Sequence, residues 1–353
     1  MGTEISEGQG RLIDKVISRG ICVGCGACVG LCPYFNYFDG KVVVLDRCLA
    51  DTWRCLQLCP RAGYEGTSLS TEKNNSVEES SIGTCRKVVM ARAVDKEIRE
   101  KAQYGGAVSS LIIYAFEKGY IRSAVLTDAG GILSPGGKLV KNRSELLDCS
   151  GSRYSSSGTL SALNQALRDG EEKIGVVGLP CQMEALARMG RMKPDGDEKI
   201  DRIALKIGLF CTWALDYRKL QTFLKNEGVD EVVEKYDIPP PPSEKFQVKT
   251  KKGWMDFPLS DIRPLVQAGC ALCEDMTAEW ADISIGTVEG REEWNMVIIR
   301  TDRGAEFVNE AVKEGRLEME ELSGKNLEHL KKAAINKRKR GIQAGIEMER
   351  SQI

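Results

Sequence analysis

The sequence predicts a mixed α/β (α+β) fold in its larger part, preceded by a small cysteine-rich domain. From Lys87 to Phe210, short apolar strands alternate with helical segments, which is typical of an α/β domain. Seven of the thirteen cysteines fall between residues 20 and 60. Residues 64–83 are rich in Ser, Thr, Glu, Asn and Gly, a composition that buries little apolar surface. We therefore expect a first domain over residues 1–66, a linker over 67–84 and a second domain over 85–353.

The first cysteine run has the pattern C-x2-C-x2-C-x3-C-P, from Cys22 to Pro33. This is the spacing of bacterial ferredoxins, in which the fourth cysteine of each run binds the other cluster. Zinc sites, the alternative, rarely pack four cysteines so tightly before a proline. The run therefore predicts a two-cluster ferredoxin-like domain. The expected ligands of its first 4Fe-4S cluster are Cys22, Cys25, Cys28 and Cys59.

The second N-terminal cluster has an irregular ligand run. Its expected thiolates are Cys32, Cys48 and Cys55, and the position three residues after Cys48 holds Asp51 rather than a cysteine. A carboxylate oxygen can bind iron, so Asp51 is a candidate fourth ligand. The alternatives are a three-iron cluster or a donor from elsewhere, such as Cys85.

Bulk composition excludes several classes of protein. The chain has 353 residues, 42% hydrophobic and 29% charged, with a formal net charge of −1. This charge gives no electrostatic basis for binding nucleic acid. No apolar run reaches the eighteen or so residues of a membrane span, and residues 1–20 do not have the pattern of a signal peptide. Thirteen cysteines in such a chain indicate metal or redox chemistry in a reducing compartment, so we expect a cytoplasmic protein.

Apolar periodicity predicts the main elements of the larger domain. The expected strands are Lys87–Ala93, Ala124–Thr127, Lys173–Val177, Ile203–Phe210, Ala281–Ile285 and Met296–Arg300, with a hairpin over Phe246–Thr250 and Trp254–Phe257. The expected helices run to Lys118, from Thr159 to Arg168, from Cys181 to about Met189, from Gly304 to Glu314, and from Lys325 onward. The last helix is basic, and we expect a solvated face, with a dock for an acidic partner as the alternative.

Two loops are candidates for cofactor binding. Gly105 and Gly106 precede a helix that contains Ser109, and free N–H groups at a helix N-terminus can bind phosphate. Tyr154, Ser155 and Ser156 form a hydroxyl-rich loop before another helix. Either loop could also be an ordinary turn. The only histidine is His329, so the chemistry is expected to depend on cofactors rather than on histidine.

A second set of cysteines lies in the larger domain. Cys181 and Cys211 each follow a predicted strand, and Cys270 and Cys273 form a lone C-x2-C. Open α/β sheets place their sites at the carboxyl ends of strands, so these thiols could converge there. They would then bind a third cluster. A zinc site and ordinary buried cysteines remain the alternatives.

These pieces in this order resemble the coenzyme F420 hydrogenase/dehydrogenase beta-subunit family over about residues 85–335. The matching stretches are Tyr104–Ser109, Val177–Gln182, Gly208–Cys211, Cys270–Asp275 and Ala281–Gly286. The resemblance implies a flavoprotein fold with FAD and a 4Fe-4S cluster. It implies that Cys181, Cys211, Cys270 and Cys273 bind this cluster. It also implies that Gly105, Gly106 and Ser109 lie against FAD, with Tyr154–Ser157 a weaker candidate.

The resemblance further implies an oxidoreductase subunit. It would exchange hydride between FAD and coenzyme F420, or NAD(P)H, and pass single electrons through its clusters. The expected partner is a hydrogenase, formate dehydrogenase or heterodisulfide-reductase type of subunit, or a ferredoxin, and a homo-oligomer stays open. The alternative is a stand-alone ferredoxin-linked reductase of an organic substrate, such as a tetrapyrrole vinyl or hydroxymethyl group. The sequence contains no motif that identifies the hydride donor.

Overall fold

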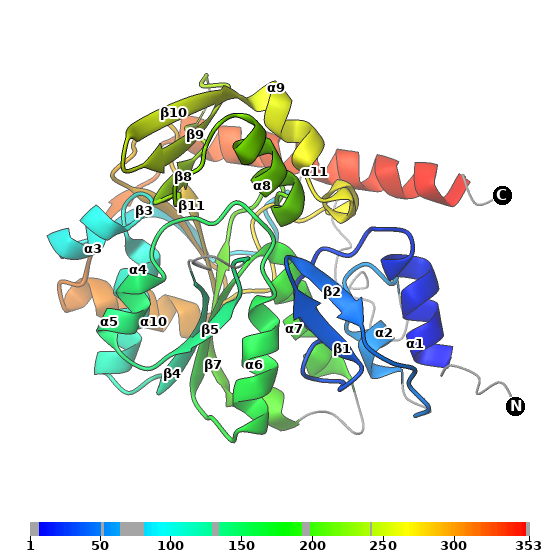
Figure 1. Ribbon diagram of the computed structural model, residues 1–353. Helices are drawn as coiled ribbons and strands as arrows, with labels where there is room; N and C mark the ends of the chain where they lie inside the picture. Colours follow the sequence, from blue (N-terminus) through cyan, green and yellow to red (C-terminus); the bar gives the residue numbers. More distant parts are fainter. Residues whose placement is uncertain are drawn as a thin grey trace, which may run out of the picture.

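An eight-stranded mixed sheet organises the larger part of the chain in the computed structural model, which describes residues 7–50, 53–63, 81–128, 134–192, 198–240 and 242–350 (Figure 1). In spatial order the strands are β13 (Leu317–Glu321), β3 (Lys87–Ala93), β12 (Asn295–Ile299), β11 (Ile283–Thr287), β7 (Ile203–Leu209), β6 (Ile174–Gly178), β4 (Ser123–Thr127) and β5 (Gly137–Val140). The predicted α/β class is confirmed.

Four central strands, β11, β7, β6 and β4, are parallel to one another. Most of their residues are buried, as expected for strands covered on both faces. Their carboxyl ends therefore lie at one edge of the sheet. The strand β5 pairs antiparallel with β4 as a hairpin, and residues 129–133 of its connection lie outside the described part.

Helices cover both faces of the sheet. One face packs against α3 (Lys96–Lys101), α4 (Ala107–Glu117), α5 (Arg143–Asp148) and α10 (Asp302–Lys313). The other packs against α6 (Thr159–Arg168) and α7 (Pro180–Arg191). Alternate strand residues explain this division, because Ala124 and Leu126 face the first group of helices while Val125 faces the second.

A second, three-stranded sheet lies above the first in Figure 1. Its antiparallel strands are β10 (Gly253–Pro258), β9 (Lys245–Thr250) and β8 (Lys235–Asp237), and it packs with α8 (Tyr217–Asn226) and α9 (Leu259–Ile262). The predicted hairpin is confirmed as β9–β10, with residues 251 and 252 as its turn. The remaining short elements near this sheet are 3-10 turns at Arg263–Leu265 and Ala268–Leu272. Another 3-10 turn, Glu198–Arg202, directly precedes β7 of the large sheet.

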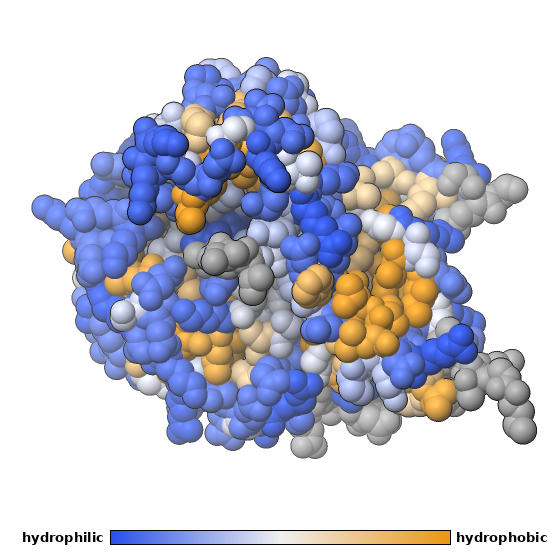
Figure 2. Space-filling view, viewed as in Figure 1, coloured by the Kyte–Doolittle hydropathy of each residue, from blue (hydrophilic) through white to orange (hydrophobic). Residues whose placement is uncertain are grey.

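The N-terminal part forms its own small core beside the large sheet. It contains α1 (Glu7–Leu12), a π-helical turn (Ile13–Ile17), the hairpin β1 (Phe35–Phe38) and β2 (Lys41–Val44), and α2 (Arg54–Gln57). Leu12 and Val16 are buried in that core. Figure 2 shows apolar residues gathered over this part of the surface, where Phe38, Leu45 and Leu49 are exposed.

The N-terminal part packs directly on the larger part. Asn164 of α6 donates two hydrogen bonds of 2.7 Å, to the backbone oxygens of Ala27 and Val29. Most of the predicted linker, residues 67–80, lies outside the described residues. At its end, Ser81 and Ile82 are buried against the larger part.

The C-terminal helix α11 (Gly324–Arg350) links the two parts. It packs on the sheet through Leu330 and Ala334, and its Met348 contacts the N-terminal core. The expectation of a wholly solvated basic face is wrong at two positions, because Lys337 and Arg338 are buried. These two side chains face inward, where Arg338 pairs with buried Glu279.

Candidate functional site

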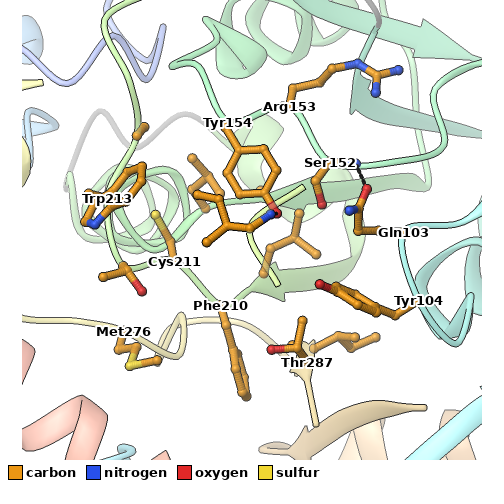
Figure 3. A pocket seen from close by; sticks show the side chains of 18 of the residues that line it. Gln103, Tyr104, Ser152, Arg153, Tyr154, Phe210, Cys211, Trp213, Met276 and Thr287 are labelled. Atoms are coloured by element: carbon orange, nitrogen blue, oxygen red, sulfur yellow. Dashed lines mark hydrogen bonds between the residues drawn. The ribbon is translucent and has the colours of Figure 1, made fainter. Parts of the chain in front are cut away.

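A cavity of about 1110 Å³ lies at the carboxyl edge of the parallel strands. Each of these strands reaches it with its last residues, at Thr127, Gly178, Leu209 and Thr287. Figure 3 shows aromatic side chains around it, Tyr104, Tyr154, Phe210 and Trp213. Ligands bind open α/β sheets at this edge, and the volume suits a large organic cofactor or substrate.

The predicted glycine loop reaches the cavity only in part. Gly106 and Ser109 line it, whereas Gly105 is not among the described residues that do so. A Cβ atom at Gly105 would come within 2.9 Å of the backbone nitrogen of Asn295, so only glycine allows the two segments to pack this closely. The side-chain oxygen of Asn295 also accepts a 3.0 Å hydrogen bond from Ala107 N. One N–H group at the start of α4 is therefore already bonded within the protein.

The hydroxyl-rich loop contributes to two spaces. Tyr154 and Ser155 line the large cavity. Ser156 lies deeper, where its hydroxyl accepts a 2.9 Å hydrogen bond from Gln267 Nε2. Burial raises the pKa of Tyr154, and the nearby Asp237 carboxylate raises it further, so this phenol stays protonated near neutral pH.

Sequence reasoning did not single out Arg153, which also lines the cavity. Its Nη2 donates to Ser150 O at 3.2 Å, while its Nε is buried without a hydrogen-bond partner among the described residues. An unsatisfied buried donor is costly, so Arg153 suits an anionic group in the cavity. His329 also lines the cavity, with Nδ1 2.6 Å from Glu289 Oε2. The sequence contains no local pattern that predicts Arg153 or His329 at the carboxyl edge of the sheet.

Four cysteines of the larger part border one small space beside the cavity; we call Cys181, Cys211, Cys270 and Cys273 the C-terminal thiol set. Cys181 is the second residue of α7, which begins two residues after the end of β6, and Cys211 lies two residues after the end of β7. Three members of the set also line the large cavity, namely Cys211, Cys270 and Cys273. The sequence expectation that these thiols converge at the strand ends therefore agrees with their positions.

The N-terminal cysteines gather in the small core and toward α6 and α7. We call Cys22, Cys25, Cys28 and Cys59 the first N-terminal set. Burial raises the pKa of the Cys28 thiol, and the charges of Cys25, Cys22, Cys59 and Cys55 raise it further. Burial raises the pKa of Cys25 to about 12. These thiols therefore share one buried, low-dielectric space.

The second N-terminal set consists of Cys32, Cys48 and Cys55. Burial raises the pKa of Cys55 to about 11, with contributions from the charges of Cys32 and Cys48. Asp51, the candidate fourth ligand, lies outside the described residues. Cys85, the alternative donor, packs with Ile82 and Met90 rather than in the core that holds Cys32 and Cys55.

The C-terminal and first N-terminal sets are neighbours. Burial raises the pKa of Cys181 most, and the next contribution comes from the charge of Cys25. Cys25 and Cys181 also pack in the same apolar cluster. The two sets of thiols are therefore adjacent in the fold.

The chemistry of these donors fits iron–sulfur clusters. Buried thiols with raised pKa values become thiolates only beside a strongly cationic group, and iron provides one. Within the described ranges, three or more His, Cys, Asp or Glu side chains do not converge on a single-ion site. A cubane is wider than one ion, so its thiolates stand farther apart.

Among the residues that the structure describes, no helix is long and apolar enough to span a membrane.

Fold and site together define an α/β protein with a large cavity at its sheet edge and adjoining sets of buried thiols. Its residues 88–164 match the family model of the coenzyme F420 hydrogenase/dehydrogenase beta subunit N-terminal region, and residues 171–325 match that of the C-terminal region. The chain therefore belongs to the coenzyme F420 hydrogenase/dehydrogenase beta-subunit family, as the sequence motifs suggested. It is an oxidoreductase subunit of that type.

Individual relatives agree with this assignment. Coenzyme F420 hydrogenase subunit beta of Methanothermobacter thermautotrophicus is 36% identical over 242 residues, 67% of this chain and 85% of that protein. Coenzyme F420-dependent sulfite reductase of Methanocaldococcus jannaschii is 32% identical over 93% of this chain, which spans 50% of that longer protein. A chain of the F420-reducing [NiFe] hydrogenase complex from Methanosarcina barkeri superposes with a TM-score of 0.70, at 32% identity, over 76% of this chain and 93% of that one.

Proposed function

We propose that this chain is an iron–sulfur flavoprotein subunit that exchanges hydride between reduced coenzyme F420 and FAD, and passes single electrons to a partner protein. One observation carries the proposal: the C-terminal thiol set borders the large cavity at the sheet edge. A two-electron cofactor in that cavity would lie next to a one-electron carrier. The names of the relatives favour F420 over NAD(P)H as the soluble donor.

Several cavity residues suit FAD. Tyr104, Tyr154 and Trp213 provide aromatic walls against which a planar ring system can stack (Figure 3). The free Nε of Arg153 can donate to a phosphate oxygen. Gly106 and Ser109 lie on the wall beside the start of α4. FAD would supply hydride exchange together with release of electrons one at a time.

The chain's own side chains shape this site rather than perform acid–base chemistry. The phenol of Tyr154 holds the β8 region in place, because it accepts a 3.1 Å hydrogen bond from Ile238 N. Gln103 Oε1 accepts a 3.2 Å hydrogen bond from Ser152 N (Figure 3). The Nε2 atom of Gln103 donates to Asp237 Oδ1 at 2.8 Å. These contacts hold the two loops on either side of the cavity at a fixed separation.

Arginines on the cavity wall suit an anionic carrier. Arg263 and Arg340 line the cavity in addition to Arg153. Coenzyme F420 carries phosphate and carboxylate groups, which guanidinium groups bind well. The same residues would also bind the phosphates of NAD(P)H, so the donor must be identified by experiment.

The thiol sets suggest the direction in which electrons leave. The C-terminal set adjoins the cavity, its Cys181 neighbours Cys25, and the second N-terminal set lies in the small outer core. We place the partner contact near that outer set. A partner of the hydrogenase, formate dehydrogenase or sulfite reductase type is consistent with the names of the relatives.

Anaerobic mixing tests the proposal. The purified chain, loaded with FAD, is mixed separately with reduced coenzyme F420, NADH and NADPH while flavin absorbance is recorded. We expect rapid bleaching with reduced F420 and little with the nicotinamides. Bleaching by NADH or NADPH alone would change the assigned donor, and no bleaching by any of the three would contradict the proposal.

A further inference from the structure

Two buried cations border the C-terminal thiol set. Arg61 follows Cys59 and Pro60 in the N-terminal part, and its side chain is 5% exposed. Lys337 lies on α11, and it is 3% exposed. Both line the same small space as the four thiols. Positive charge therefore reaches this site from two distant segments of the chain.

The guanidinium of Arg61 is only partly satisfied by the protein. Its Nε donates to Gly269 O and its Nη1 to Pro60 O, both at 2.9 Å. Its Nη2 is buried without a hydrogen-bond partner in the described part of the chain. The carboxylate paired with it, on Glu184, stands 4.0 Å away and also binds Arg188. Arg61 thus has donor capacity left beside the thiols.

The ammonium of Lys337 has a similar position. Its Nζ donates to Cys211 O at 2.6 Å, and the described residues include no ion-pair partner for it. One turn later Gly341 lets α11 lie against the Cys273 backbone, because a Cβ atom there would stand only 3.0 Å from the Cys273 carbonyl. This close approach fixes Lys337 over the site.

Burying two cations is costly unless anions balance them, and the carboxylate beside Arg61 stands 4.0 Å away and is shared with Arg188. A cluster bound by four thiolates is a net anion, and its negative charge grows by one on reduction. Nearby cations therefore stabilise the reduced form more than the oxidised form. This effect favours acceptance of an electron.

We propose that Arg61 and Lys337 are the counter-charges of the cluster bound by the C-terminal thiol set, and that they raise its reduction potential. The proposal rests on the proposed function, since it concerns the same thiols. The step is a one-electron reduction without bond making or breaking. It needs no proton, because both side chains keep their charge.

Arg61 is also close to the first N-terminal set, because it comes two residues after Cys59 while its side chain borders the space of the C-terminal thiol set. It therefore stands between two adjacent sets. Removing its charge would shift both potentials, whereas removing the charge of Lys337 would shift mainly the C-terminal one.

A redox titration of the whole chain, followed by electron paramagnetic resonance, tests the proposal. Lys337→Met should make reduction of the C-terminal cluster about tenfold less favourable, a shift of about 59 mV to lower potential for one electron. Lys337→Arg should restore most of the potential. Lys339→Gln, at an exposed position of the same helix, is the matched control and should change nothing.

Iron content and visible spectra are recorded for each variant. If Lys337→Met loses iron, the redox titration is performed on Lys337→Gln instead, because its amide can still donate a hydrogen bond to Cys211 O. Unchanged potentials in the neutral variants, with a full iron complement, would overturn the proposal. A wild-type chain without iron at the C-terminal set would instead refute the proposed function, so the two failures are distinguishable.

Discussion

At the scale of single residues, Arg300 holds several segments together. Its guanidinium donates to Ser284 Oγ at 2.7 Å, to the backbone oxygens of Ile82 and Thr84 at 3.0 Å, and to Thr277 O at 3.0 Å. It is 7% exposed. The end of the predicted linker is thereby fixed to the sheet.

We expect Arg300→Lys to lower the free energy of unfolding by about 2–4 kcal/mol, because an ammonium group cannot reach all these acceptors. Urea unfolding of the holoprotein measures this loss of unfolding free energy. Arg291→Lys is the control: Arg291 pairs with Glu320 at a half-exposed position, so the change should cost less than about 1 kcal/mol. Equal losses in both variants would show that the Arg300 network contributes little.

Asp51 gives a second prediction at this scale. If its carboxylate binds iron, Asp51→Cys should keep a cubane with a changed potential, since thiolate is the softer donor. Asp51→Ala should lose about one iron per chain. Iron analysis and paramagnetic resonance check both changes. Unchanged spectra in both variants would exclude Asp51 as a ligand.

At the scale of elements, the short helix α3 depends on Asp95, the residue that precedes it. Asp95 accepts a 2.9 Å hydrogen bond from Glu97 N as the N-cap, and its carboxylate pairs with Arg143 of α5 at 2.7 Å. The hydrogen bond from Arg143 lowers the pKa of Asp95. The stabilisation is therefore complete above the ordinary carboxyl pKa of about 3.9 and is lost as the pH falls through the lower folded value.

Asp95→Ala should cost about 1 kcal/mol at pH 7, mostly from the lost cap, because the exposed ion pair adds little. Asp95→Asn should cost less, since an amide oxygen also caps. The difference between wild type and Asp95→Ala should narrow below about pH 4. Denaturation curves from pH 7 downward measure this difference, and one that widens in acid would contradict the assigned role.

The predictable elements are those with strong local patterns. The apolar runs of β3, β6 and β7 predicted buried strands to within one or two residues, and the turn at residues 251–252 predicted the β9–β10 hairpin. The strand β13 was missed because it is an edge strand with the polar sequence LEMEE. The helix α3 was missed because Ile98 is its only buried residue.

The residues of the site also fall into predictable and unpredictable groups. Cysteine spacing and strand ends pointed to the thiols, since those features are local in the sequence. The sequence could not show that Arg61 and Lys337 are buried beside them. Which face of a basic helix turns inward depends on tertiary contacts, here the passage of α11 over the Cys270–Cys273 turn.

At the scale of the whole molecule, the N-terminal and larger parts form a continuous packed unit. Asn164 is buried, and its amide donates to two backbone oxygens of the first cysteine run. Asn164→Ala should lower the free energy of unfolding by about 1–3 kcal/mol, because both carbonyls lose their donor. The exposed neighbour Gln165 is the control, and its replacement by Ala should cost under about 0.5 kcal/mol. If urea unfolding shows similar losses of unfolding free energy for the Asn164 and Gln165 variants, the Asn164 contact does not stabilise the packing of the two parts.

The central claim is that three sets of thiols form one electron route from the cavity to the outer core. The most direct measurement is the iron and flavin content of the chain purified without oxygen. We predict about twelve iron atoms and one FAD per chain, or about eleven iron atoms if the second N-terminal set holds a three-iron cluster. About four iron atoms per chain, with all thirteen cysteines present, would contradict the claim, because only one set would then hold a cluster.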